Sequence, residues 1–254
     1  MAFAHYVAIG DSMSMDLYPA LDVGATAVAV ALERLSEAGE VAPVGAASLL
    51  FRNAEERWPD DVGDDLSTLS PGIDLRILAH DGATIGDVFG EQLLELEESD
   101  APTLVTVTAG GYDLLSAAAN RPTRDLLRAI ARDVAEAYEF LVDAVRRVRP
   151  NATLLLTTIC DPSDGTGTVP GAFEGKGAVP LEALRQLNDA IRKLGGGTPQ
   201  TIVADAYARF FGHGVTAEPE DRWYWRRTLV DPNAVGANEL RRLWLDSIRP
   251  LLNG

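Results

Sequence analysis

The feature that most constrains the fold is the alternation of short apolar runs with segments of helical periodicity. The apolar runs, read as strands, cover residues 6–9, 73–79, 103–108, 152–159 and 201–204. Apolar residues recur at helical spacing in residues 24–39, 46–53, 84–98, 123–149, 181–194 and 234–252. Strands that alternate with helices pair in parallel and are covered on both faces. The sequence therefore predicts a five-stranded parallel sheet in a three-layer α/β/α sandwich, within one domain over residues 1–254.

Charge limits the partners that such a protein can bind. The 254 residues include 22 Lys plus Arg and 38 Asp plus Glu, which gives a formal net charge of −16. Nucleic acids and anionic membranes are bound through basic surfaces, so this balance argues against both. A neutral or cationic small-molecule substrate is favoured instead.

Three observations bear on location. No stretch contains the ~18 consecutive apolar residues of a membrane-spanning helix. The segment Met1–His5 has no basic residue ahead of an apolar run, as a signal peptide would have. Cys160 is the only cysteine, so no intramolecular disulfide can form. We expect a cytoplasmic protein.

Four of the predicted strands end in turns rich in glycine and polar side chains. These turns are Gly10-Asp11-Ser12, Asp81-Gly82, Gly110-Gly111-Tyr112-Asp113 and Cys160-Asp161. The carboxyl ends of parallel strands lie at one edge of the sheet, where open α/β sheets bind ligands. We therefore expect the four turns to form one cleft. Gly10 allows the chain to turn sharply, so Ser12 is presented to a substrate rather than packed in the core.

These turns carry a family resemblance. Gly10-Asp11-Ser12-Met13-Ser14 resembles the first motif block of the SGNH (GDSL) hydrolases, and Gly82 matches the glycine of the second block. Gly110-Gly111-Tyr112-Asp113 matches the third block, Gly-X-Asn-Asp. The segment Asp231–Gly236 falls where the last block reads His-Pro-Asn-Ala-X-Gly. The four blocks occur in family order and span nearly the whole chain.

An intracellular, actinobacterial-type branch of that family shows further similarity. The matching stretches are Asp16–Pro19, Asp161–Gly167 and Gly212–Gly214. Relative to this branch, residues 20–43 look like an insertion.

The resemblance implies a flavodoxin-like sandwich and a serine hydrolase that cleaves an ester or other acyl bond without a cofactor. Ser12 would attack the carbonyl carbon, and the backbone N–H groups of Ser12 and Gly82 would face the developing oxyanion. Tyr112 replaces the family's Asn and would be a longer-reaching donor. Asp11 and Asp113 are placed with Gly82 and Tyr112 among the oxyanion-stabilising or substrate-binding residues.

The identity of the catalytic base is left open. Asp231 stands where the family has its catalytic His, and Thr228 stands where it has Asp. A serine hydroxyl needs a nearby base, and an aspartate with a pKa of ~3.9 is a weak one unless burial raises that value. The candidates are Asp231 itself, His213 with Asp231 as its partner, and His80. For each histidine the alternative is a hydrogen-bonded structural residue. For Asp231 the alternative is a cap at the start of the last helix.

Other functions of the cleft also remain open. An acyltransferase would use the same groups as a hydrolase. A cleft that has lost hydrolysis could belong to a non-hydrolytic biosynthetic enzyme, with Asp11, Tyr112 and Asp231 as acid–base groups, or to a ligand-binding pseudoenzyme. No His, Cys or carboxylate group has the spacing of a metal site, and the glycine turns do not follow the dinucleotide pattern.

Four remaining segments receive simpler interpretations. The acidic residues 60–65 are expected to form a solvated surface loop. The long loop up to residue 178 suggests a pocket wall or lid. Cys160 is expected to be a small buried apolar residue. The aromatic and basic cluster Trp223–Arg227 fits an acyl-pocket wall, a packing patch or a subunit contact in a homo-oligomer.

Overall fold

A parallel sheet forms the middle layer of the computed structural model, which describes residues 2–24, 43–120, 122–170 and 178–252. Its strands are β1 (His5–Gly10), β2 (Asp74–Ile77), β3 (Thr103–Thr108), β4 (Ala152–Thr157) and β5 (Thr201–Ala204). The order across the sheet is β2-β1-β3-β4-β5, and every neighbouring pair is parallel. This is the doubly wound order of flavodoxin-like folds, and it confirms the predicted α/β/α architecture.

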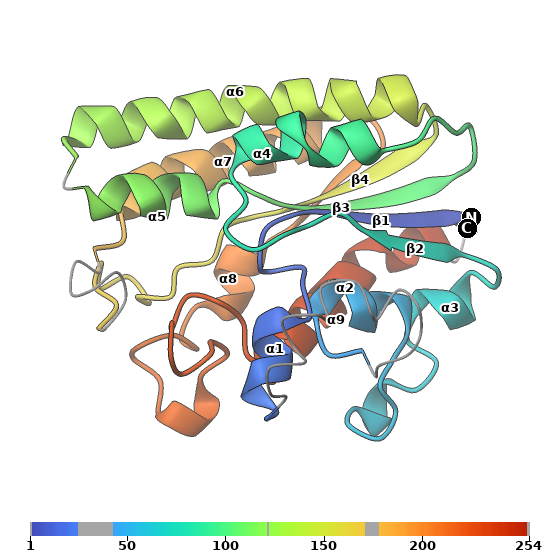
Figure 1. The fold of residues 1–254 in the computed structure, drawn as a ribbon, viewed down its shortest axis with the longest axis horizontal. Helices are drawn as coiled ribbons and strands as arrows, with labels where there is room; N and C mark the ends of the chain where they lie inside the picture. Colours follow the sequence, from blue (N-terminus) through green and yellow to red (C-terminus); the bar gives the residue numbers. More distant parts are fainter. Residues whose placement is uncertain (1, 25–42, 121, 171–177, 253–254) are drawn as a thin grey trace.

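Helices cover both faces of the sheet (Figure 1). One face carries α4 (Ile85–Gly90), the 3-10 turn η3 (Gln92–Glu95), α5 (Gly111–Ala119), α6 (Arg124–Val148) and α7 (Leu181–Gly197). The other carries α1 (Leu17–Asp22), α2 (Ala46–Phe51), α3 (Leu66–Leu69), α8 (Ala206–Phe210) and α9 (Ala234–Leu252). Two more 3-10 turns are η2 (Pro59–Asp61) and η5 (Pro219–Asp221). In the part of the chain described, every helix falls short of the length or apolarity that crossing a membrane requires.

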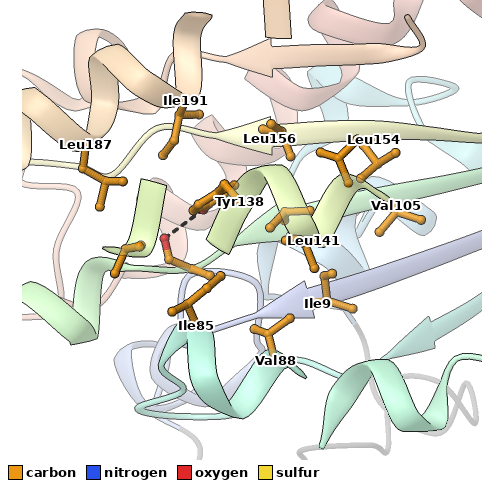
Figure 2. Packing of buried hydrophobic residues seen from close by; sticks show 14 of the residues in the cluster. Ile9, Ile85, Val88, Val105, Tyr138, Leu141, Leu154, Leu156, Leu187 and Ile191 are labelled. Carbon is orange, nitrogen blue, oxygen red and sulfur yellow. Dashed lines mark hydrogen bonds between the residues drawn. The ribbon is translucent and has the colours of Figure 1, made fainter. Parts of the chain in front are cut away.

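The strand side chains alternate between two cores, one on each face of the sheet. Val7 and Ile9 of β1 point into the core beneath α4, α6 and α7, while Tyr6 and Ala8 point into the core around α2 and α9. Figure 2 shows the first core, with Tyr138 of α6 among the apolar side chains and hydrogen-bonded to the carbonyl oxygen of Ala109. Continuous burial of β1, β3 and β4 explains why these strands read as apolar runs.

Helix boundaries show where sequence periodicity misleads. The helix expected over 84–98 ends at Gly90, because Glu91 leaves the helical region with φ −131° and ψ −62°, and η3 follows. The helix expected over 181–194 instead continues through three glycines. A Cβ atom at Gly195 would lie 2.2 Å from a methyl carbon of Val203, so glycine lets α7 approach β5 closely.

Residues 25–42 lie outside the described residues. The helix predicted over 24–39 falls almost wholly within that range, as does most of the insertion assigned to 20–43. The same holds for residues 171–177 of the loop expected to form a pocket wall or lid.

The expectation of a solvated acidic loop at 60–65 is wrong for Asp61 and Asp65, which are buried, whereas Asp60 and Val62 are exposed. Asp61 is only 6% exposed and forms ion pairs with Arg241 at 2.7 Å and Arg242 at 2.9 Å, both on α9. Glu239, also on α9, pairs with Arg242 at 2.9 Å. We call these four residues the Asp61 ion-pair cluster. The charge of Asp61 can be buried because the fully buried Arg241 and the half-buried Arg242 neutralise it, which a run of acidic letters does not reveal.

Candidate active site

The turn after β1 places Ser12 at the carboxyl edge of the sheet. Gly10 has φ 121°, and a Cβ atom there would lie 1.6 Å from the carbonyl oxygen of Thr108. Glycine is therefore required for the chain to leave β1 so close to β3. The N–H of Asp11 donates to that same Thr108 oxygen at 2.7 Å, which fixes the turn that carries Ser12.

Ser12 meets Asp231 across 219 positions of sequence. The Ser12 hydroxyl donates to Oδ1 of Asp231 at 2.8 Å. Asp231 lies just before α9 and is 8% exposed. Burial raises its pKa to about 6; hydrogen bonds from Thr228 and Ser12 oppose the rise, and the charge of Asp81 adds to it. A carboxylate with this pKa is largely ionised at neutral pH and is a stronger base than an ordinary aspartate.

The two histidine candidates lie elsewhere. His213 has its Nδ1 3.0 Å from the carbonyl oxygen of Asp221, and its ring stacks on Trp223 with 3.6 Å between centroids. His80 has Nδ1 3.3 Å from the carbonyl oxygen of Asp81 and Nε2 3.5 Å from the Glu91 carboxylate. Neither ring lines the pocket around Ser12. Of the three base candidates, the structure brings Asp231 alone to the serine.

A cavity of about 390 Å³ opens at Ser12. Its polar lining includes Asp11, Ser12, Asp81 and Asp231. Its apolar lining, which we call the apolar wall, includes Leu114, Leu115, Ile159, Val179, Pro180 and Leu184. A reactive polar group beside an apolar wall suits a ligand with a polar reacting bond and an apolar substituent. Among the described residues, no group of three or more His, Cys, Asp or Glu side chains could hold a metal ion.

Gly82 and Tyr112 lie together at this cavity. Gly82 has φ 67°, and a Cβ atom there would come within 3.7 Å of the Tyr112 ring. Within the described part of the chain, the backbone N–H groups of Ser12 and Gly82 donate no hydrogen bond to protein. Both residues line the pocket, so their N–H groups are available to a ligand oxygen. Tyr112 is 44% exposed, and its ring lies beside Gly82.

Asp11 and Asp113 occupy different environments. Asp11 lines the pocket and accepts the N–H of Met13 at 3.1 Å. Burial raises its pKa to about 7, with smaller contributions from the charges of Asp231 and Asp113. Asp113 does not line the pocket; its carboxylate accepts the N–H of Ile85 at 3.0 Å, at the start of α4. Asp113 thus ties the third turn to the helix that follows the second.

Tyr18 lines the pocket although sequence reasoning did not assign it to the site, and Asp81, expected only as part of a cleft turn, lines it too. The Tyr18 hydroxyl donates to the Asp81 carboxylate, 3.1 Å from each oxygen, and its ring packs on Trp225 at 5.3 Å. Burial first, then the charges of Asp231 and Asp81, raise the pKa of Tyr18. The available signal was the branch-like stretch Asp16–Pro19, which contains Tyr18. Of the three interpretations of the cluster Trp223–Arg227, this contact of Trp225 supports a packing patch.

The other branch-like stretches pack against each other beside the pocket. Asp164 accepts backbone N–H groups of Gly212, Gly214 and Thr216 at 2.9–3.1 Å. Pro162, from the same turn, lines the cavity. Cys160 also lines the cavity while packing against the core, and burial raises the pKa of its thiol. Cys160 is half-buried rather than fully buried as expected, and a protonated thiol is unreactive.

The family model for GDSL-like lipases and acylhydrolases matches residues 8–238. The chain belongs to this GDSL-like lipase/acylhydrolase family. The match runs through the Ser12 turn and the Asp231 segment, so it covers the elements that build the pocket. The family resemblance inferred from the four motif blocks is confirmed.

Solved structures share the fold of this GDSL-like chain. Phospholipase A1 from Streptomyces albidoflavus matches with 20% identity and a TM-score of 0.64, covering 97% of this chain and 100% of its own. An extracellular lipase from Streptomyces rimosus matches with 18% identity and a TM-score of 0.56, covering 96% and 99%. An acetylxylan esterase from Geobacillus stearothermophilus matches with 15% identity and a TM-score of 0.56, covering 97% and 94%. The curated proteins gave no match.

Proposed function

We propose that this GDSL-like protein hydrolyses acyl esters of small molecules through Ser12, with Asp231 acting directly as the base. The observation that carries the proposal is the 2.8 Å hydrogen bond from the Ser12 hydroxyl to Asp231. The raised pKa of Asp231, about 6, gives a carboxylate that can accept the serine proton more readily than an ordinary aspartate. In this scheme one carboxylate replaces the histidine and the aspartate of the family pattern.

The reaction proceeds in two halves. As Ser12 Oγ bonds to the ester carbonyl carbon, its proton passes to Asp231, and the carbonyl oxygen becomes an oxyanion facing the N–H groups of Ser12 and Gly82. Tyr112 supplies a third donor. The C–O bond to the alcohol then breaks, and the alcohol leaves with the proton from Asp231. In the second half, water loses a proton to Asp231 and attacks the acyl carbon. The bond to Ser12 Oγ then breaks, Ser12 regains the proton from Asp231, and the acid is released.

The cavity supports an ester with an apolar substituent. The apolar wall residues Leu114, Leu115, Ile159 and Leu184 line the same cavity as the acidic side chains. Phospholipase, lipase and acetylxylan esterase activities are the ones named for three structural relatives, and all three cleave acyl esters. We assign the acyl chain to the apolar wall and the alcohol to the side of Asp81 and Tyr18.

The test compares the wild type with Ser12→Ala on p-nitrophenyl acetate and butyrate. We expect the wild type to hydrolyse both esters and the variant to lose at least ~1,000-fold in rate. A serine-directed fluorophosphonate should label the wild type and not the variant. Equal hydrolysis by both proteins would reject Ser12 as the nucleophile. Absence of both hydrolysis and labelling would favour a non-hydrolytic enzyme or a binding protein in this cleft.

A further inference from the structure

A buried side-chain amide holds both backbone groups of the residue that begins the nucleophile turn. Gln92, the first residue of η3, is 2% exposed. Its Oε1 accepts the N–H of Gly10 at 2.7 Å, and its Nε2 donates to the carbonyl oxygen of Gly10 at 2.9 Å. An amide has one oxygen acceptor and one nitrogen donor group, so the side chain matches a backbone N–H and C=O together. We call this arrangement the Gln92 clamp.

The clamp joins two of the loops that form the proposed site. Gly10 lies two residues before Ser12, and its carbonyl oxygen also accepts the N–H of His80 at 3.1 Å. His80 in turn lies two residues before Gly82. The turn carrying the nucleophile and the loop carrying an oxyanion donor thus meet at one carbonyl oxygen, which Gln92 holds from the core side.

Gly10 has little freedom to find other partners if the clamp is lost. Its φ of 121° and its tight approach to Thr108 fix its backbone, and its N–H lies beyond the reach of water in the buried core. Removal of Gln92 leaves a buried N–H without an acceptor, which the turn relieves by shifting. A shift of about 1 Å in a reacting group is enough to lower a rate ~100-fold.

We propose that Gln92 is a positioning residue that sets Ser12 and Gly82 relative to each other for the attack on the ester. This inference rests on the proposed hydrolytic function of Ser12. Gln92 touches neither the cavity nor Ser12, so it acts through Gly10. No motif block of the sequence includes it.

The protein contains a matched control for this device. Asn188 of α7 is fully buried and clamps Ile159 in the same way, accepting its N–H at 2.7 Å and donating to its carbonyl oxygen at 2.8 Å. Ile159 belongs to the apolar wall of the cavity and is remote in sequence from the nucleophile turn. The two clamps are chemically alike but hold different parts of the site.

The first experiment compares Gln92→Leu with Asn188→Leu, each of which removes both hydrogen-bonding groups of its clamp. We expect Gln92→Leu to lower kcat for p-nitrophenyl butyrate ~100-fold with KM changed less than about twofold. Asn188→Leu should act mainly on KM, because it loosens the wall that contacts the acyl chain. Both should lower the melting temperature similarly. A wild-type kcat in Gln92→Leu, or the same kinetic change in both variants, would overturn the proposal.

The second experiment uses Gln92→Glu and the pH. A protonated Glu carboxyl accepts through one oxygen and donates through the other, so it restores both contacts with Gly10, whereas an ionised carboxylate cannot donate. Burial favours the protonated form of such a group. The ratio of variant to wild-type kcat should therefore approach one at low pH and fall as pH rises. A ratio that stays low at every pH, including low pH, would contradict the clamp.

A third measurement separates this inference from the proposed function. Hydrogen exchange of the Gly10 amide should be faster in Gln92→Leu than in Asn188→Leu, whether or not the protein hydrolyses an ester. If the wild type and Ser12→Ala hydrolyse esters equally, the proposed function fails. If Gly10 exchange is unchanged in Gln92→Leu, the clamp itself fails.

Discussion

Asp61 and Asp231 are buried to nearly the same extent, 6% and 8% exposed, yet they lie in opposite electrostatic environments. Asp61 contacts two arginines of α9; burial alone would raise its pKa, but the hydrogen bonds of Arg242 and the charge of Arg241 outweigh burial and lower it. Asp231 forms no ion pair among the described residues, and burial raises its pKa to about 6.

This difference suits the Asp61 carboxylate to a structural role and the Asp231 carboxylate to proton transfer. A carboxylate paired with two arginines, one of them fully buried, has a lowered pKa and ties η2 to α9. A carboxylate buried without a cation keeps a pKa near neutral, where it can both accept and return a proton. Burial of an acidic side chain is common to both regions, and the presence or absence of a countercharge decides its role.

The largest effect should follow removal of the base. Asp231→Asn keeps the shape and an acceptor for the Ser12 hydroxyl but cannot take its proton. We expect kcat on p-nitrophenyl acetate at pH 8 to fall roughly 10,000-fold. Asp61→Asn is the matched control, since it neutralises an equally buried aspartate outside the cavity. Comparable losses in kcat in the two folded variants would show that Asp231 is no more catalytic than Asp61.

Stability should respond in the opposite way. Asp61→Asn leaves the fully buried Arg241 without its anionic partner, which should lower the free energy of unfolding by about 4 kcal/mol. Urea denaturation at pH 7 measures this change. Asp125→Asn, at an exposed position on α6, should stay within about 0.5 kcal/mol of the wild type. An Asp61→Asn protein as stable as the control would show that the cluster contributes nothing.

The pH dependence of stability tests the same contrast. Asp231 has a folded-state pKa raised from 3.8 to about 6, so the folded protein binds its proton more tightly than the unfolded chain does. The contribution of Asp231 to the free energy of unfolding is complete below pH ~4 and is lost as pH rises through ~6, a change of about 3 kcal/mol. In Asp231→Asn, the free energy of unfolding should not show this decrease as pH rises.

Urea denaturation at pH 4 and pH 8 checks that expectation. The free energy of unfolding of Asp231→Asn should gain about 3 kcal/mol relative to the wild type between those two pH values. A constant difference between the two proteins would mean that the Asp231 carboxyl has an ordinary pKa when folded.

A smaller effect is expected at the oxyanion side. Tyr112→Phe removes one hydroxyl donor while keeping the ring on Gly82, and we expect kcat to fall about tenfold with KM little changed. The loss is smaller than for a fixed backbone donor because Tyr112 is 44% exposed and its hydroxyl forms no hydrogen bond with the described residues. Unchanged kcat would limit Tyr112 to packing over Gly82.

Much of the fold followed from local sequence. β3 and β5 have the predicted bounds, because β-branched runs between turn residues are unambiguous, and α9 begins and ends as predicted. The short helices α1, α3, α5 and α8 were not predicted. They are stabilised by tertiary packing, and helices of this length have little periodicity to read.

Several residues of the site could be predicted from sequence, but the burial and pKa of Asp231 could not. Motif blocks brought Ser12, Gly82 and Asp231 to one cleft, and the structure places all three at one cavity. Whether Asp231 was buried could not be read from sequence, since burial comes from residues remote along the chain. His213 was a reasonable base by residue type, but Trp223 and Asp221 hold its ring away from the cavity. Gln92 carried no signal because its partner is a backbone group.

The most direct test of the account is the pH profile of kcat/KM for a short-chain aryl ester in the wild type, Asp231→Asn and His213→Ala. If Asp231 is the base, wild-type kcat/KM should rise with pH through a single ionisation near pH 6 and level off above it, because the ionised carboxylate is the active form. His213→Ala should reproduce that profile, and Asp231→Asn should lose it together with the activity. A profile that survives in Asp231→Asn, or that disappears in His213→Ala, would contradict direct activation of Ser12 by Asp231.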